Sequence, residues 1–539
     1  MAQDGSEIDA SIVEYGAQLK HSIPIYSDGS GKIYQFSGWK RNNTGVVYEP
    51  SESGAILESE TYACANESYT AQYIVVADLV ATEESPVVIN TNSTVITTTV
   101  RVKGDLIVSE GSELTTEVLV VEGSTEQSGS VKGSVKANKA YFDLSNPDGF
   151  KARTWYSVAV PWQVSVPAYN LVNSGVSVSA DGLSFNKLEL GRTYDLLYYD
   201  GARRAKEGHS DDCWKYVEHD NSSEHILYPG RAYMIYFLED VQTIRFERKS
   251  GASLYTSSIN VTAAASHTGS NRDASWNGIA NPSLYPAYLN AAANDANYGL
   301  NYGQVYNGIS DTYSPFDMSA NKLLVGQAIF VQSEKTEPIV ANSDVYASVA
   351  PRRSMNKTEM SRFDIMLAPI DGEETDRVIV RMSDVKRRNE YVVGQDMSKM
   401  GISNKVAQMW IDKYETNLLI NTEIPVNNQA DYPLSIRVPQ DGEYLIYIEE
   451  QEQEETMLYL TYDNEPIWNL CYGGYVANLT KGTDKHYGLR MVRNNANVLS
   501  GIKEASVENS AQIRKVLISD NVYIIRNGVV YTIDGQRIK

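Results

Sequence analysis

The sequence predicts an all-β protein that is built from several modules in tandem. Three observations support this prediction. Tyr, Val and Thr recur throughout the chain, with 37 tyrosines among 539 residues, and these residue types favour pleated, half-buried surfaces. Many short segments alternate between apolar and polar residues, as strands with one buried face do. The chain is also too long for one hydrophobic core and should divide into roughly three to five domains.

The first expected module covers residues 1–78. Tyr34 and Phe36 alternate with polar residues before Gly38-Trp39, and Tyr69, Ala71 and Tyr73 alternate in the same way. Both segments are predicted strands with one buried face. The sequence Asn-Asn-Thr-Gly at positions 42–45 is a turn signal between them.

This first module resembles the Listeria–Bacteroides repeat, also called the internalin-B-type repeat. The resemblance rests on YQFSGW, which matches a Y-x-F-x-G-W strand, and on the later YTAQY, which matches a closing Y-T-A-x-Y strand. It covers residues 12–76 and implies a small β-grasp-like fold of the kind found in surface proteins. The opening strand of the family is barely represented by residues 8–13, which is consistent with a truncated module and a longer parent chain.

Residues 79–142 have a different residue pattern and are expected to form a connector. Short pairs of Val, Ile and Leu, such as Val87/Val88, Val95/Ile96 and Leu106/Val108, alternate with Gly, Ser, Asn, Thr and Glu. Strands this short with turns this frequent favour a short β-solenoid or a tight meander.

A β-sandwich-like domain is predicted over residues 143–350. The segments TWYSVAVPW, YDLLYYDG, AYMIYFLED, TIRFERK and VGQAIFVQ are its expected strands. The dipeptide Asp200-Gly201 predicts a hairpin turn after one of them. The order of these segments resembles an uncharacterised β-sandwich that accompanies such repeats in Bacteroidetes surface proteins.

A second β-sandwich domain is predicted over residues 351–500. The segments RFDIMLAP, DRVIVRM, YPLSIRVP, GEYLIYIEE and TMLYLTYDN each alternate over five or more residues. Several alternating strands joined by turns at intervals of roughly ten residues are typical of a β-sandwich.

The tail, residues 501–539, is expected to contain a β-hairpin, since two apolar segments flank Asn527-Gly528. It resembles the C-terminal ends of proteins that Bacteroidetes export, including those with a type IX-like sorting signal. The resemblance implies an extracellular or cell-surface protein, although a plain hairpin that closes the last domain also explains these residues. Met1 leads directly into acidic, polar sequence with no signal peptide, so we expect the leader to be absent from this sequence.

The charge of the chain disfavours two classes of partner. The formal net charge is −21, which repels nucleic-acid phosphates and anionic lipid. No apolar run approaches the length of a membrane-spanning helix. The three cysteines, Cys64, Cys213 and Cys471, fall in different expected domains and form no disulfide framework. We therefore expect no nucleic-acid partner and no membrane-spanning segment, and the oligomeric state stays open.

The usual catalytic motifs are missing. The sequence has no G-x-S-x-G, H-E-x-x-H, C-x-x-C or G-x-x-x-x-G-K-[ST], and only six histidines. No cofactor is expected, with calcium as the one open alternative. The densest polar stretch is a candidate cation site, and an exposed acidic loop is its structural alternative. Its candidate ligands are Asp211, Asp212, His219, Asp220, Glu224 and His225.

Aromatic residues near predicted loops are candidate ligand-binding residues, because a flat ring with polar neighbours can stack on a sugar. Core packing is the alternative explanation for each of them. The candidates are Trp162, Trp214, Trp276, Tyr302 and Tyr306.

Taken together, these observations favour a non-catalytic cell-surface protein for adhesion or ligand binding, with a host or microbial surface glycan or protein as partner. The first alternative is a carbohydrate-binding protein that is accessory to polysaccharide use. The second is a glycoside hydrolase or other hydrolase with its site in residues 143–350, since pairs of catalytic carboxylates leave no sequence motif.

Overall fold

The fold was analysed in a computed structural model of the chain. The structure describes residues 25–27, 33–48, 69–76, 78–90, 94–124, 126–167, 174–181, 184–208, 213–217, 224–256, 259–261, 276–290, 302–318, 321–332, 339–342, 360–370, 375–384, 386, 389–393, 395–452, 455–493, 513–518, 521–526 and 529–532.

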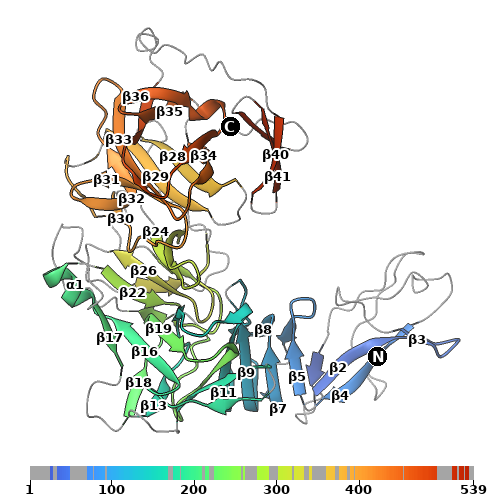
Figure 1. Cartoon of the computed structure of the whole chain (residues 1–539). Helices are drawn as coiled ribbons and strands as arrows, with labels where there is room; N and C mark the ends of the chain where they lie inside the picture. Colours follow the sequence, from blue (N-terminus) through green and yellow to red (C-terminus); the bar gives the residue numbers. More distant parts are fainter. Residues whose placement is uncertain are drawn as a thin grey trace.

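The described residues confirm the all-β prediction, since strands arranged in several sheets make up most of them. Figure 1 shows the sheets of the first half of the chain side by side along the base, with the last large domain above them. The expected domain boundaries stay predictions, and the sheets are described below in chain order.

The two strands expected in the first module are present and pair with each other. They are antiparallel, with Phe36 opposite Tyr73 and Trp39 opposite Ala71. Two shorter strands complete the sheet. The bounds are β1 (Ile25–Ser27), β2 (Ile33–Arg41), β3 (Val47–Tyr48) and β4 (Tyr69–Val76).

The connector is solenoid-like, because the chain alternates between two parallel sheets. The first sheet contains β5 (Asp78–Ala81), β7 (Thr94–Val102), β9 (Glu113–Gly123) and β11 (Val135–Phe150). The second contains β6 (Val87–Ile89), β8 (Asp105–Val108) and β10 (Ser130–Lys132).

Apolar residues stack from coil to coil in this region. Leu79, Val100, Leu119 and Ala140 are aligned on successive strands and are all fully buried. One coil therefore takes about 20 residues, within the range of solenoid repeats. Alternation of buried and exposed residues within each strand turns one apolar row inward, and this row forms the core between the two sheets.

The solenoid sheet continues directly into the central region. Strand β11 runs through the boundary expected at residue 142 and pairs on its other side with β20. One buried cluster extends from Leu79 to Val325. The strands added to this sheet are β20 (Val241–Glu247), β14 (Val176–Ser179) and β15 (Asn186–Lys187).

The described residues of the central region form four further sheets. The first, called here the β16 sheet, orders β12 (Trp155–Val158), β19 (Tyr233–Phe237), β16 (Tyr194–Tyr199) and β17 (Trp214–Tyr216). The second pairs β13 (Val164–Pro167) with β18 (Glu224–Leu227). The third orders β22 (Trp276–Ala280), β26 (Ala328–Gln332), β24 (Tyr302–Asn307) and β25 (Thr312–Asp317). The fourth orders β21 (Ile259–Val261), β27 (Ile339–Asn342) and β23 (Tyr288–Asn290).

The hairpin turn expected at Asp200-Gly201 is wrong, because this position starts a helix. Asp200 is the N-cap of α1 (Gly201–Glu207), and its carboxylate accepts a hydrogen bond from the backbone N–H of Arg203. An aspartate is a preferred N-cap, and the Ala, Arg, Lys and Glu residues that follow favour a helix. The chain therefore turns once through α1 before β17 pairs with β16.

The described residues of the last large domain form one twelve-stranded sheet that folds around a hydrophobic core. Its main path orders β36 (Glu465–Asn469), β35 (Thr456–Tyr462), β39 (Tyr487–Arg493), β33 (Gln429–Val438), β31 (Gln408–Lys413), β32 (Thr416–Glu423), β29 (Asp376–Ser383), β28 (Met360–Pro369), β34 (Gly442–Glu452) and β37 (Tyr475–Leu479). Two short strands flank this path, β30 (Met397–Ser398) and β38 (Gly482–Asp484).

The tail contains the predicted hairpin. Strands β41 (Asn521–Arg526) and β42 (Val529–Thr532) are antiparallel, with Arg526 opposite Val529. A third strand, β40 (Ile513–Ile518), pairs with the other edge of β41.

Candidate functional site

Four of the five aromatic residues proposed as ligand-binding lie together, at the contact between the central region and the last domain. Trp276 and Tyr302 are buried members of one hydrophobic cluster, and the half-buried Trp214 and Tyr306 pack against it. We call this contact the joint. From the last domain it includes Ile379, Met397, Met400, Leu419 and Ile420.

Packing explains most of these candidates better than sugar stacking does. Trp276 is fully buried, and the guanidinium of the buried Arg204 lies 4.9 Å from its ring centroid. Tyr302 is 4 % exposed and accepts a hydrogen bond from Arg362 of the last domain. The fifth candidate, Trp162, is fully buried in the separate core that joins the solenoid to the central region.

Of the six proposed cation ligands, the structure describes the side chain of His225 alone. Asp211, Asp212, His219 and Asp220 lie outside the described residues, and only the backbone of Glu224 is described, in β18. His225 is 8 % exposed and faces Val166 across the β13–β18 pair. Over the described ranges, no group of three or more His, Cys, Asp or Glu side chains is arranged to hold a metal ion.

The outer face of the β16 sheet carries a second group of aromatic residues. Strand alternation decides which side chains share this face. Tyr156, Leu196 and Ile235 point into the buried core on the inner side. Their sequence neighbours therefore point outward. From the strand pairing, the outward residues include Trp155, Asp195, Tyr236 and Tyr216. We call these four residues the aromatic face.

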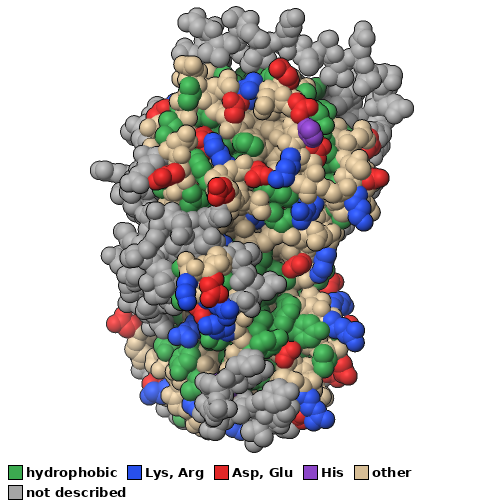
Figure 2. All heavy atoms as spheres, turned by 60° about the vertical axis from the view of Figure 1, so that its left-hand side comes forward, with side chains coloured by type: hydrophobic (Ala, Val, Ile, Leu, Met, Phe, Trp, Pro, Cys, Tyr) green, Lys and Arg blue, Asp and Glu red, His purple; other side chains and the backbone are tan. Residues whose placement is uncertain are grey.

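The aromatic face combines stacking surface with solvent access. Trp155 and Tyr236 are half-buried, and their ring centroids are 5.1 Å apart at an interplanar angle of 43°. Tyr216 is 40 % exposed. Figure 2 brings the side of the molecule with β16 and β17 forward and shows hydrophobic side chains gathered in its lower half, with charged side chains around them.

Asp195 supplies a polar group at the centre of this face. It lies directly opposite Tyr236 on the neighbouring strand, and Tyr236 in turn lies opposite Trp155. Burial raises the pKa of the Asp195 carboxyl above its usual range. Among the described residues, the structure gives its carboxylate no hydrogen bond and no ion pair. A half-buried carboxylate without a partner is costly, and a bound ligand with hydroxyl groups would remove this cost.

A glycine fixes the edge of the aromatic face. An added Cβ at Gly308, in the turn between β24 and β25, would lie 1.8 Å from the carbonyl oxygen of Trp155. Only glycine allows this approach. The hairpin of β24 and β25 therefore lies against β12, beside the face. Its Tyr306 and Tyr313 belong to the joint, and their ring centroids are 4.9 Å apart.

Sequence reasoning missed every residue of the aromatic face, because it looked for candidates near predicted loops. Trp155, Asp195 and Tyr236 all lie inside strands. The signal that was present is the period-2 alternation of TWYSV and YDLLYY, which places Trp155 and Asp195 on faces opposite to the apolar residues beside them.

No family model, no curated protein and no solved structure matches the chain. In the part of the chain that the structure describes, no helix has both the length and the apolar character needed to cross a membrane.

Proposed function

We propose that the chain is a non-catalytic cell-surface protein for adhesion or ligand binding, and that the aromatic face is its binding surface. The observation that carries this proposal is Asp195, a half-buried carboxylate without a described partner, which lies opposite Tyr236, whose ring in turn packs against Trp155. The resemblances of the first module and of the tail to exported surface proteins support the location.

A carbohydrate is the class of ligand that this chemistry favours. The apolar C–H face of a sugar ring matches the rings of Trp155, Tyr216 and Tyr236, and tyrosine and tryptophan rings combine contact area with a polar group. The Asp195 carboxylate can accept hydrogen bonds from two vicinal hydroxyl groups, and bonds to an ionised acceptor are the stronger kind. The described residues of this face contribute one carboxylate, whereas a typical glycosidase uses two.

A glycan-array screen of the full chain tests this proposal. The wild-type protein should bind a defined class of glycans, and Tyr216→Ala and Asp195→Asn should each lose most of the signal. Tyr462→Ala is a matched control, because Tyr462 is 38 % exposed, close to the 40 % of Tyr216, and lies on β35 of the last domain. Binding that all three variants retain would place the ligand elsewhere.

A further inference from the structure

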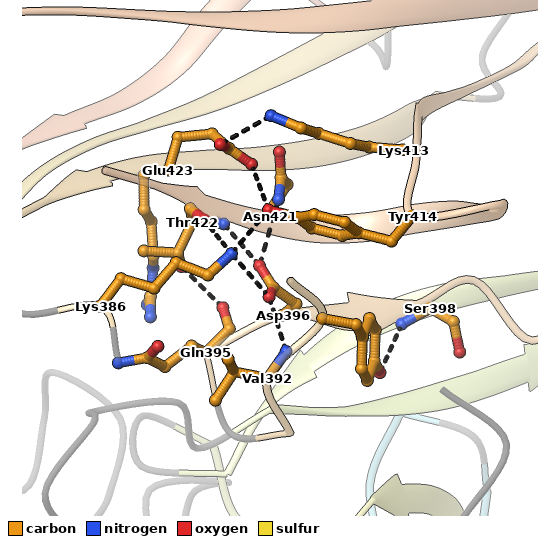
Figure 3. Close-up of polar contacts among 12 residues, drawn as sticks. Lys386, Val392, Gln395, Asp396, Ser398, Lys413, Tyr414, Asn421, Thr422 and Glu423 are labelled. Atoms are coloured by element: carbon orange, nitrogen blue, oxygen red, sulfur yellow. Dashed lines mark hydrogen bonds and ion pairs between the residues drawn. The ribbon is translucent and has the colours of Figure 1, made fainter. Parts of the chain in front are cut away.

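A buried polar cluster in the last domain plays no part in the proposed glycan binding. It lies where the segment between β29 and β30 packs against β32, directly beside the joint (Figure 3). Its members are Lys386, Asp396, Tyr414, Asn421, Thr422 and Glu423.

A lysine and an aspartate lie in contact at the centre of this cluster. The side chains of Lys386 and Asp396 are both 0 % exposed, and Lys386 Nζ is 3.0 Å from Asp396 Oδ2. Removing two charges from water is expensive, and a hydrophobic pair of similar size would be at least as stable. The stabilising energy of an ion pair therefore does not explain why these two residues are buried in contact.

Every oxygen of the Asp396 carboxyl is held in place. Oδ1 accepts hydrogen bonds from the backbone N–H of Thr422 at 2.8 Å and from Asn421 Nδ2 at 3.1 Å. Oδ2 accepts one from the backbone N–H of Val392 at 2.9 Å. Burial raises the pKa of Asp396, and this effect outweighs the opposing effects of Lys386 and the backbone donors. The neutral acid is therefore easier to reach here than at an exposed aspartate, and a neutral carboxyl group can be attacked by an amine.

A path for a proton leads away from the lysine. Lys386 Nζ is 3.0 Å from the Tyr414 hydroxyl, which donates to Glu423 Oε1 at 2.9 Å. The second oxygen of Glu423 lies 2.6 Å from Lys413 Nζ. Tyr414 thereby connects Lys386 Nζ to the Glu423 carboxyl group and gives a proton a hydrogen-bonded route from one to the other.

We propose that Lys386 and Asp396 become joined by an amide bond between Nζ and Cγ. The proton that neutralises the acid moves from Nζ to Oδ2 across their hydrogen bond, and the neutral amine then attacks Cγ. A second amine proton passes through Tyr414 to Glu423. Oδ1 carries the negative charge of the tetrahedral intermediate, held by the two N–H donors from Thr422 and Asn421 in the manner of an oxyanion hole.

The intermediate collapses with loss of water. The Cγ–Oδ2 bond breaks, and Oδ2 leaves with its own proton and the proton that Glu423 returns. The balance is one amide formed and one water released, with no oxidant, reductant or activating group. Because the fold holds the amine and the carboxyl group in contact, the reaction avoids the entropic cost of bringing them together from solution.

A second buried pair in the same domain shows what the relay adds. Lys399 Nζ lies 2.5 Å from Asp376 Oδ2, and both side chains are buried. The other acceptor recorded for Lys399 is the carbonyl oxygen of Met409, at 3.2 Å. No tyrosine–carboxylate relay is recorded at this pair among the described residues, so we expect it to stay an ion pair.

The bond would secure the segment that forms the joint. Tyr391, between the two linked residues, donates to Gln332 of the central region at 2.5 Å. The backbone groups of Ser398 and Met400, which follow Asp396 closely in the chain, are both hydrogen-bonded to the side chain of Gln304. Linking the two ends of this segment would hold all of these contacts in register.

The mass of the intact, denatured and reduced full chain tests the proposal. The wild-type protein should be lighter than its sequence by the mass of one water molecule. After trypsin digestion, the peptide 382–387 should remain joined to the peptide 389–399, with no cleavage after Lys386. A wild-type mass equal to the sequence mass, with these peptides separate, would overturn the proposal.

Variants assign the roles within the cluster. Lys386→Met and Glu423→Gln should both show the full sequence mass, and the exposed-lysine control Lys485→Gln should keep the loss of one water. Loss of one water in Glu423→Gln would refute the role of the relay. Loss of two waters in the wild type would show that Lys399 and Asp376 react without a relay. If a variant fails to fold, the wild-type peptide map still decides the proposal.

Discussion

Replacing Gln304 with methionine should loosen the joint between the central region and the last domain. The Gln304 side chain is fully buried on β24 and bridges to the last domain. Its Nε2 donates to the carbonyl oxygen of Ser398 at 2.8 Å, and its Oε1 accepts from the backbone N–H of Met400 at 3.0 Å. Methionine keeps the length of the side chain and removes both hydrogen bonds.

The expected cost follows from the two backbone groups that lose their partner. Ser398 and Met400 are 2 % and 1 % exposed, so water does not replace the glutamine without a rearrangement. An unsatisfied buried group costs about 1–3 kcal/mol, so the two together cost about 2–6 kcal/mol. Since about 1.4 kcal/mol corresponds to a factor of ten, opening of the joint should become at least roughly 30-fold more frequent.

Hydrogen exchange measures this opening directly, because a multidomain chain does not have one free energy of unfolding. Backbone amides of residues 397–400 should exchange at least roughly 30-fold faster in Gln304→Met. Gln242→Met is the control, because Gln242 is an exposed glutamine whose side chain donates a hydrogen bond to the carbonyl oxygen of Asn146, within the central region. Unchanged exchange at residues 397–400 in Gln304→Met would refute the bridging role.

Two further predictions concern a glycine and a histidine. Gly133, with φ of +97°, would place an added Cβ 1.9 Å from the carbonyl oxygen of Val108, so Gly133→Ala should destabilise the solenoid by about 1–3 kcal/mol and lower its thermal midpoint. Gly251, with φ of +77° and open space around it, is the control for backbone strain alone. Equal losses of stability in Gly133→Ala and Gly251→Ala would contradict the clash. A hydrogen bond to Asp463 raises the pKa of His486, so this pair stabilises the fold fully below about pH 6.5, and its contribution is lost as the pH rises through the folded pKa. An NMR titration should show the pKa of His486 falling in Asp463→Asn, and an unchanged value would show that the pair has no effect.

Local patterns were sufficient to predict the class of fold and the solenoid-like connector. Short apolar pairs such as Val87/Val88 are too short to form helices, and the frequent turn signals between them predict that the chain reverses direction repeatedly. The structure stacks them in parallel coils, with Val87 opposite Leu106. The Asn-Gly signal in the tail also correctly placed a hairpin. Asp200-Gly201 failed as a hairpin signal because aspartate serves equally well as a helix N-cap, and only the sequence after it separates the two cases.

The candidate site was harder to predict, because exposure depends on distant partners. Trp276 lies beside turn-rich sequence, yet it is fully buried in a hydrophobic cluster to which the last domain also contributes. Trp155 lies within a strand, yet its side chain is only half-buried, because the core occupies the other side of the β16 sheet. The burial of Lys386 and Asp396 had no sequence signal at all. They lie in a polar stretch without periodicity, and residues 421–423, which contact them, come from another strand.

Isothermal titration calorimetry with a glycan selected on the array tests the central claim most directly, because the same trace reports binding and turnover. We predict a saturable heat that returns to the baseline after each injection, and that disappears in Asp195→Asn and persists in Tyr462→Ala. A heat signal that continues between injections would mean that the protein converts the glycan, and an identical isotherm for Asp195→Asn would mean that the aromatic face does not bind it. Either result would contradict the account.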